Sequence, residues 1–164
     1  ILANGVFGQG PSGLGYMTAA AGAGAAAASI FKAVSRPQVP GEFQPQILAM
    51  PVIIPLLVAA FAMIGDFATA VAAVALVGAT VTLMSISLQS TVQMEIEDQY
   101  RGRVMGLWTT ISIGSGAAGA VLMGFLVDLV GVAPAQLMIG LVLAAASVLV
   151  LLRFRRGLSQ ADAR

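Results

Sequence analysis

The stretch from residue 67 to residue 94, FATAVAAVALVGATVTLMSISLQSTVQM, contains no charged residue. A bilayer core about 30 Å thick requires roughly 20 apolar residues in an α-helix, so this stretch is long enough to cross a membrane. Other charge-free runs share this property, and they cover residues 1–31, 43–65, 104–127 and 129–152. The sequence therefore predicts five transmembrane helices.

The composition of the whole chain agrees with a membrane setting. Hydrophobic residues make up 59% and charged residues 9% of the 164 residues, whereas soluble domains carry about 25% charged residues. The net charge of +1 provides no basic surface for nucleic acid, and the chain has neither Cys nor His for soft-metal chemistry. We therefore expect an all-α integral membrane protein embedded in a lipid bilayer, with no nucleic-acid partner, no cofactor and no metal.

Charged residues and helix breakers set the predicted boundaries. We place a transmembrane bundle at residues 13–152, with spans near 14–33, 47–64, 68–92, 104–126 and 135–152, and a tail at 153–164. Because the chain begins at Ile1 without a signal peptide, we expect the true N-terminus to be missing. Residues 1–12 are then interpreted as the remnant of a preceding helix and its outer loop.

The basic residues predict the orientation. Consecutive spans alternate in direction, so the first connection, the third connection and the C-terminus share one side of the membrane. That side holds every basic residue, namely Lys32, Arg36, Arg101, Arg103, Arg153, Arg155, Arg156 and Arg164. The opposite side holds only Asp66 and Asp128 among the charged residues. The positive-inside rule then places the C-terminus in the cytoplasm. With a composition that suggests a bacterium, we expect a multi-pass protein of the plasma membrane, which is the bacterial inner membrane.

The predicted third span carries an unusual polar face. Thr82, Ser85, Gln89 and Gln93 are spaced by three or four residues and share one side of a helix. Because uncompensated amides are costly in hydrocarbon, this face should either line a water-filled cavity or donate hydrogen bonds to another helix. Ser112 of the fourth span is a candidate to face it. We treat these five residues as candidates for lining a substrate cavity.

The predicted fourth span carries a stripe of small residues. Ser112, Gly116, Ala120 and Gly124 lie at successive i+4 positions, and such stripes allow helices to approach closely in membranes. The stripe is interpreted as a static packing surface or as a sliding contact between moving halves of a protein. By contrast, the second and fifth spans are aliphatic on almost every side, which predicts peripheral positions facing lipid.

The residues before the fourth span resemble a known family. The segment EIEDQYRGRVMGLWTTISIGSGAAGAVLMGFLVDLVG at residues 95–131 resembles the segment that enters the eleventh helix of major facilitator superfamily transporters, especially the drug and siderophore exporters. GLGYMTAAAGAGAAA at 13–27, QSTVQ at 89–93 and LLRFRR at 151–156 are similar to their eighth, tenth and twelfth helices. The resemblance implies five helices of a C-terminal six-helix bundle. It also implies a missing N-terminal half of the same transporter as partner, and a small-molecule substrate.

One part of the chain departs from that family. The connection from Lys32 to Gln46 lacks the acidic, glycine-containing motif that some members carry between the eighth and ninth helices. No gating role is therefore expected for Lys32 or Arg36.

The charged segment itself allows two interpretations. Asp98, Arg101 and Arg103 could form an ionic latch that closes a cytoplasmic gate, with Gly102 permitting a tight turn between helices. Alternatively, the arginines are only orientation anchors.

The preferred functional hypothesis is secondary active export of a small drug-like or siderophore-like compound by alternating access, driven by a proton gradient. No carboxylate lies at mid-depth of a predicted span, so either the proton carrier lies in the missing part or the protein is not coupled to protons. An enzyme is not expected, since no serine has a histidine or buried acid to activate it, and no catalytic residue is assigned. A small oligomeric channel or a membrane scaffold remains the alternative.

Overall fold

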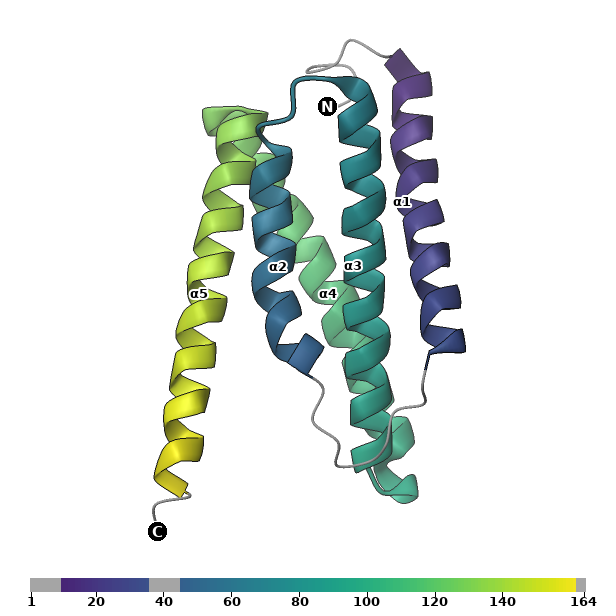
Figure 1. Cartoon of the computed structure of the whole chain (residues 1–164), viewed down its shortest axis with the longest axis vertical. Helices are drawn as coiled ribbons and strands as arrows, with labels where there is room; N and C mark the ends of the chain where they lie inside the picture. Colours follow the sequence, from purple (N-terminus) through teal and green to yellow (C-terminus); the bar gives the residue numbers. More distant parts are fainter. Residues whose placement is uncertain (1–9, 36–44, 162–164) are drawn as a thin grey trace.

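The chain folds as an all-α protein, which confirms the predicted fold class. The computed structural model describes residues 10–35 and 45–161. Within these ranges the chain forms five helices (Figure 1), which are α1 (Gly10–Val34), α2 (Pro45–Phe61), α3 (Phe67–Glu95), α4 (Asp98–Val130) and α5 (Val132–Ala161). Arg36 and residues 1–9 of the expected remnant lie outside the described residues, and Gly10–Ser12 begin α1.

The helices run alternately up and down, as Figure 1 shows. This arrangement places Lys32, at the end of α1, and Arg101, at the start of α4, at the same end of the bundle as Arg153 of α5. Asp66 and Asp128 lie at the opposite end, where α3 begins and α4 ends. The described charges are thus segregated along the bundle axis. The long apolar segments between them are free of charge.

Four of these helices have the length and composition of membrane spans. They are Ser12–Val34, Phe67–Glu95, Asp98–Val130 and the apolar part of α5, Val132–Arg153. Helix α2 is shorter, with 17 residues, and ends at Phe61 rather than near residue 64. The chain leaves it through a turn in which Ala62, Met63 and Ile64 donate backbone hydrogen bonds to the third residue before each of them. This tightening is common where an α-helix ends.

The turn between α2 and α3 is fixed by a side-chain cap. Asp66 has an extended backbone, and its carboxylate accepts a hydrogen bond of 2.7 Å from the Thr69 amide. Such a cap satisfies one of the free N–H groups in the first turn of a helix. The hydrogen bond from the Thr69 backbone lowers the pKa of Asp66 below its ordinary value of 3.8, and a side-chain hydrogen bond with Thr69 adds to the effect. The exposed acid therefore starts α3.

The other connections are also short. Helix α4 is separated from α5 by Gly131 alone, whose φ of 86° is accessible to glycine at little cost. Its amide donates a 2.9 Å hydrogen bond to the Val127 carbonyl and so closes the last turn of α4. Helix α3 passes to α4 through Ile96 and Glu97, which are both extended.

Close helix contacts occur where glycines leave room for a neighbouring backbone. Helices α1 and α3 cross at Gly24 and Gly78, where an added Cβ would collide with the carbonyls of Ala75 and Ala21 respectively. Helices α2 and α5 meet at Gly140, whose Cβ would lie 2.7 Å from the Pro55 carbonyl oxygen. Small residues at such crossings let membrane helices gain dispersion contacts between their backbones. The bundle is therefore built around two close pairs, α1 with α3 and α2 with α5.

The exposed surface is largely apolar, as a lipid-facing surface should be. Large hydrophobic side chains such as Ile30, Phe31, Phe125 and Leu149 are more than half exposed. The buried cluster is small and lies at the Asp66 end, where Met17 of α1 contacts Phe61 and Ala70. Helix α4 has no buried residue. Helix packing alone thus leaves one side of α4 uncovered among the described residues.

Candidate transport cavity and charged turn

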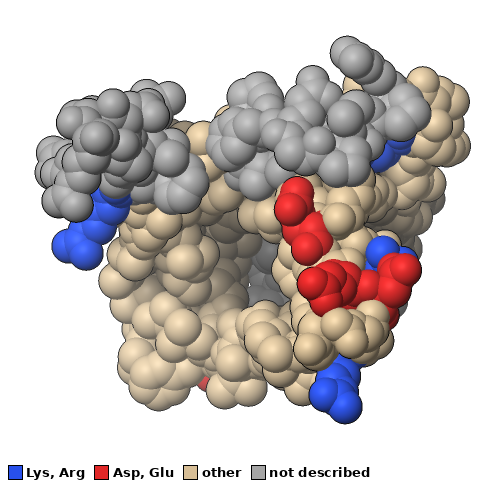
Figure 2. Space-filling view, turned by 90° about the horizontal axis from the view of Figure 1, so that it is seen from below, with Lys and Arg blue, Asp and Glu red and all other residues tan. Residues whose placement is uncertain are grey.

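Two cavities lie between the helices in the half of the bundle nearer Asp66. The larger, of about 640 Å³, lies between α1, α3, α4 and α5. The smaller, of about 400 Å³, lies between α1, α2, α3 and α5. Figure 2, viewed from the opposite end, shows a hollow among the helices, and the coloured charged side chains lie around it toward the outer rim. The two cavities adjoin, because Ala21, Val74 and Gln136 line both.

The walls of both cavities are aliphatic with a few polar groups. The larger cavity has Leu14, Met123 and Val127 as typical lining residues, and Thr18 and Gln136 as its polar members. The smaller cavity is lined by residues such as Phe61 and Val81, with Thr82 and Gln136 as its polar members. Within residues 10–35 and 45–161, no charged residue lines either cavity. The arrangement suits an apolar molecule with a small polar group.

The polar face predicted on α3 is only partly directed to these cavities. Thr82 lines the smaller one. Gln89 is half-buried, whereas Ser85 and Gln93 are exposed, and none of these three lines either cavity. On α4, Ser112 is exposed as well. The structure therefore does not bring the five candidate cavity residues together around one of the described cavities.

Hydroxyl groups on the flanks of this face are satisfied within the helix itself. Thr80 donates to the Leu76 carbonyl at 2.8 Å, and Thr91 donates to the Ser87 carbonyl at 2.9 Å. Such bonds to the preceding turn satisfy a hydroxyl in an apolar setting without a partner helix. The threonines at these two positions thus need no aqueous cavity.

The small-residue stripe of α4 divides between two environments. Ala120 and Gly124 line the larger cavity. Ser112 and Gly116 are exposed, and a Cβ added at Gly116 would meet no atom within 4 Å among the described residues. The close helix approaches occur instead at Gly24, Gly78 and Gly140, described above. The stripe is therefore not a helix-packing surface among the described helices.

Gln136 is the polar residue that sequence reasoning missed. It lies in α5, in a helix interpreted as peripheral and aliphatic, yet only 8% of the residue is exposed. Its neighbours on the same face, Gly140 and Ala144, are buried as well. The available signal was a lone amide in a charge-free span, since such groups in membrane helices usually face the protein interior. The prediction that α5 faces lipid on almost every side is therefore wrong for this face.

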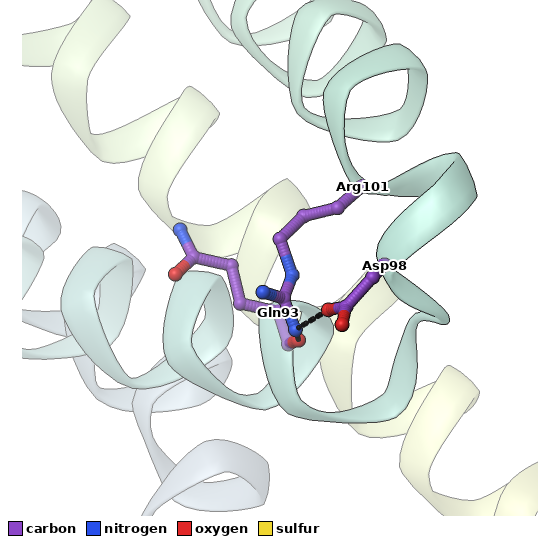
Figure 3. Close-up of polar contacts among 3 residues, drawn as sticks. All are labelled: Gln93, Asp98 and Arg101. Carbon is purple, nitrogen blue, oxygen red and sulfur yellow. Dashed lines mark hydrogen bonds and ion pairs between the residues drawn. The ribbon is translucent and has the colours of Figure 1, made fainter.

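The charged segment lies in the turn from α3 to α4 and in the first turns of α4. Arg101 forms an ion pair of 2.9 Å with Asp98, three residues before it on the same helix. Its guanidinium also donates a long hydrogen bond of 3.4 Å to the Gln93 carbonyl in the last turn of α3. Figure 3 shows the guanidinium between the Asp98 carboxylate and that carbonyl. Arg101 thus links the end of α3 to the start of α4.

The electrostatics of this contact are those of an exposed pair. The side chains of Arg101 and Asp98 are 50% and 89% exposed, so solvent screens their attraction strongly. Asp98 also lies in the first turn of α4, where a negative charge complements the helix dipole. Arg103 is exposed on the next turn. Of the residues expected to form the latch, Asp98 and Arg101 therefore pair within one turn of α4, whereas Arg103 takes no part in this ion pair.

Gly102 does not have the conformational role expected for it. Helix α4 begins at Asp98, so Gly102 lies inside the helix, and the tight turn is made by Ile96 and Glu97. The prediction of a turn at Gly102 is wrong because two extended residues suffice to reverse the chain. Gly102 remains open to solvent, since an added Cβ would meet nothing within 4 Å.

The fold and the cavities together define a multi-pass α-helical membrane protein with an apolar interior between its helices. Over residues 1–164 the chain matches the model of the transmembrane secretion effector family, a major facilitator family. The protein belongs to this family of membrane transporters. No curated protein and no solved structure matches it.

Proposed function

We propose that the protein exports a small organic compound as a secondary active transporter that works by alternating access. The observation that carries the proposal is the match to transmembrane secretion effectors over the whole chain. The two adjoining cavities support it, because they provide a space between helices with room for an organic molecule. A drug-like compound fits the aliphatic walls.

The proposed partner is an N-terminal half of the same transporter, which would complete the cavity and cover α4. The support for this partner is the exposed surface of α4, where residues 109–122 are all exposed. Gly114, Gly116 and Gly119 on this segment have no neighbouring atoms within 4 Å among the described residues. A glycine-rich surface of this kind suits close approach by another membrane helix.

Proton coupling is part of the proposal, with its carrier in that partner half. The described acidic residues lie at the ends of the bundle, with Asp66 and Asp128 at one end and Glu95, Glu97 and Asp98 at the other. Proton relays in transporters use ionisable groups within the membrane. The described helices would therefore supply the cavity wall rather than the proton carrier.

We place the end with the basic residues in the cytoplasm of a bacterial inner membrane. Lys32, Arg101, Arg103 and Arg153 gather there among the described residues, which is the distribution that the positive-inside rule associates with the cytoplasmic side. The Arg101 contact with Asp98 would then serve as the cytoplasmic latch. It would break as the cavity opens inward.

Reconstitution tests this function. The intact transporter, in proteoliposomes with an imposed proton gradient, should accumulate or expel fluorescent amphipathic compounds against their concentration gradient, and a protonophore should abolish the movement. A channel would only equilibrate the compounds, and that result would refute the proposal.

For the latch, the matched variants are Arg101→Gln and Arg153→Gln, which remove the same charge from the same end. Only the first should reduce transport.

A further inference from the structure

The side chain of Gln136 is buried without a hydrogen-bonding partner in the part of the chain that the structure describes. It is 8% exposed and lines both cavities, and among the described residues no hydrogen bond is formed by its amide group. A primary amide offers two N–H donors and a carbonyl acceptor. A buried amide without partners is unfavourable, and native structures rarely keep one without a reason. A molecule that formed hydrogen bonds with the amide would therefore gain binding free energy from them.

The surroundings of the amide restrict the charge of such a molecule. Among the described residues, both cavities are lined mainly by aliphatic side chains and small residues, with one phenyl ring and two threonines, and no charged residue lines them. The nearest described acid in the sequence, Asp128, lies in the last turn of α4 and lines neither cavity. An ionic group would lose its hydration there without a counter-charge. The site thus disfavours both carboxylates and ammonium groups.

The position of Gln136 further restricts the shape of the molecule. The residue lies where the cavities of about 640 Å³ and 400 Å³ adjoin, so apolar space extends from the amide in two directions. Thr18 in the larger cavity and Thr82 in the smaller one are the other polar lining groups. A ligand with one polar group and an extended aliphatic part matches this arrangement.

We propose that Gln136 is the polar anchor of a binding site for an uncharged, largely aliphatic molecule that carries a carboxamide or a similar donor and acceptor pair. The proposal rests on the proposed transport function, whose substrate class it narrows. A carboxamide can exchange two hydrogen bonds with the Gln136 amide, while its aliphatic part replaces contacts that the empty walls lack. Highly charged siderophores are excluded from this site.

Three probes with one alkyl chain test the charge requirement. Radiolabelled decanamide, decanoate and decylammonium are compared for saturable binding to the intact protein in nanodiscs, with protein-free nanodiscs subtracted. Decanamide should bind at least about tenfold more tightly than either ionic probe, because an ionic group would lose its hydration in the cavity without a counter-charge. A tenfold difference in affinity corresponds to about 1.4 kcal/mol. Equal binding of the three probes would overturn the proposal.

Matched substitutions test the anchor. Gln136→Leu keeps the volume in an apolar setting and should weaken decanamide binding about tenfold, as expected for the loss of one or two hydrogen bonds. The control, Gln99→Leu, makes the same change at an exposed position near Asp98 and should bind as the wild type does. Unchanged binding by Gln136→Leu refutes the anchor role.

A measurement on the unsubstituted protein keeps the test independent of variant folding. Decanamide carrying a terminal diazirine should crosslink to residues that line the two cavities, such as Met123 of α4 or Val81 of α3, and unlabelled decanamide should compete. Crosslinking elsewhere, or evidence that another helix of the polypeptide fills the cavities and contacts Gln136, would overturn the proposal. If Gln136→Leu transports compounds against their gradient as well as the wild type does, the binding site at Gln136 is refuted and the transport function stands. If decanamide binds through Gln136 but no compound is transported against its gradient, the transport function is refuted instead.

Discussion

Substitution of Gly78 by Ala should separate α1 from α3. A Cβ at this position would lie 2.5 Å from the Ala21 carbonyl oxygen and 3.1 Å from the Ala21 Cα. Ordinary contact begins near 3.4 Å, so the helices would have to move apart by about 0.9 Å at the crossing. The obstacle is the backbone of a helix, which cannot rotate away as a flexible side chain could.

The magnitude follows from two opposing terms. Overpacking of a close contact costs about 1–3 kcal/mol, and the exchange of Gly for Ala inside a helix returns roughly 0.8–1 kcal/mol. Because backbone meets backbone, we expect the upper part of the range and a net loss of about 1–2 kcal/mol for Gly78→Ala. Gly22→Ala is the matched control on α1, since its Cβ would meet nothing within 4 Å.

The assay is reversible unfolding of the intact protein in mixed micelles by increasing mole fraction of SDS, followed by far-ultraviolet circular dichroism. Gly78→Ala should shift the midpoint to lower SDS, and Gly22→Ala should leave it unchanged or raise it. If both variants unfold at the same midpoint, the close crossing of α1 and α3 does not stabilise the bundle and the reasoning fails.

Three further predictions concern the two ends of the bundle. Because the chain has no native Cys, single Cys residues replacing Lys32 or Arg103 should react with an impermeant maleimide from one face of the membrane, and one replacing Asp66 from the other; labelling of all three from one face would contradict the topology. Arg101→Gln should change the free energy of unfolding by at most about 1 kcal/mol, since exposed ion pairs contribute little; a larger loss in SDS titration would show a structural role. The lowered pKa of Asp66 means that its ionised carboxylate stabilises the fold above pH 3.8, and that this stabilisation is lost as the pH falls through the folded-state pKa. The melting temperature of the wild type should therefore fall more on acidification than that of Asp66→Asn, whose side chain caps the helix without titrating. Parallel pH profiles of the two melting temperatures would refute this.

The helices themselves were predictable because charge marks the ends of apolar runs. Each predicted span lies largely within one helix of the structure. The ends differ where polar residues continue a helix beyond the apolar part. Helix α4 begins at Asp98 rather than near residue 104, and α5 continues to Ala161 rather than ending near residue 152. Hydropathy reports the solvent of a segment, whereas backbone hydrogen bonding decides where the helix starts.

The pairing of the helices was not predictable in the same way. The chain has 19 glycines, and the most regular small-residue stripe in the sequence lies on α4, where Gly116 contacts nothing among the described residues. The close crossings occur at Gly24, Gly78 and Gly140, which show no comparable regularity. A glycine permits close approach but does not select the partner, because the partner depends on the position of every other helix.

The same limitation explains why Gln136 was missed and Thr82 was not. Thr82 belongs to a repeated polar pattern on one helix, and a repeat can be recognised within a single segment. Gln136 is isolated in its segment, and its meaning comes from the helices around it. Gln136 lies in α5, which packs against α2, and it lines two cavities whose other walls come from the remaining helices. Because an isolated polar residue in a membrane span is costly to leave in lipid, it should be predicted to face the protein interior.

The distribution of close contacts also accounts for where the cavities lie. In lipid, apolar side chains gain little by leaving their surroundings, so tight packing concentrates where backbones can approach. In this bundle those places are the crossings of α1 with α3 and of α2 with α5. Space remains where one pair meets the other and where α4 stands apart, and both cavities lie at these junctions. The glycines that fix each pair therefore also determine the unfilled volume beside Gln136.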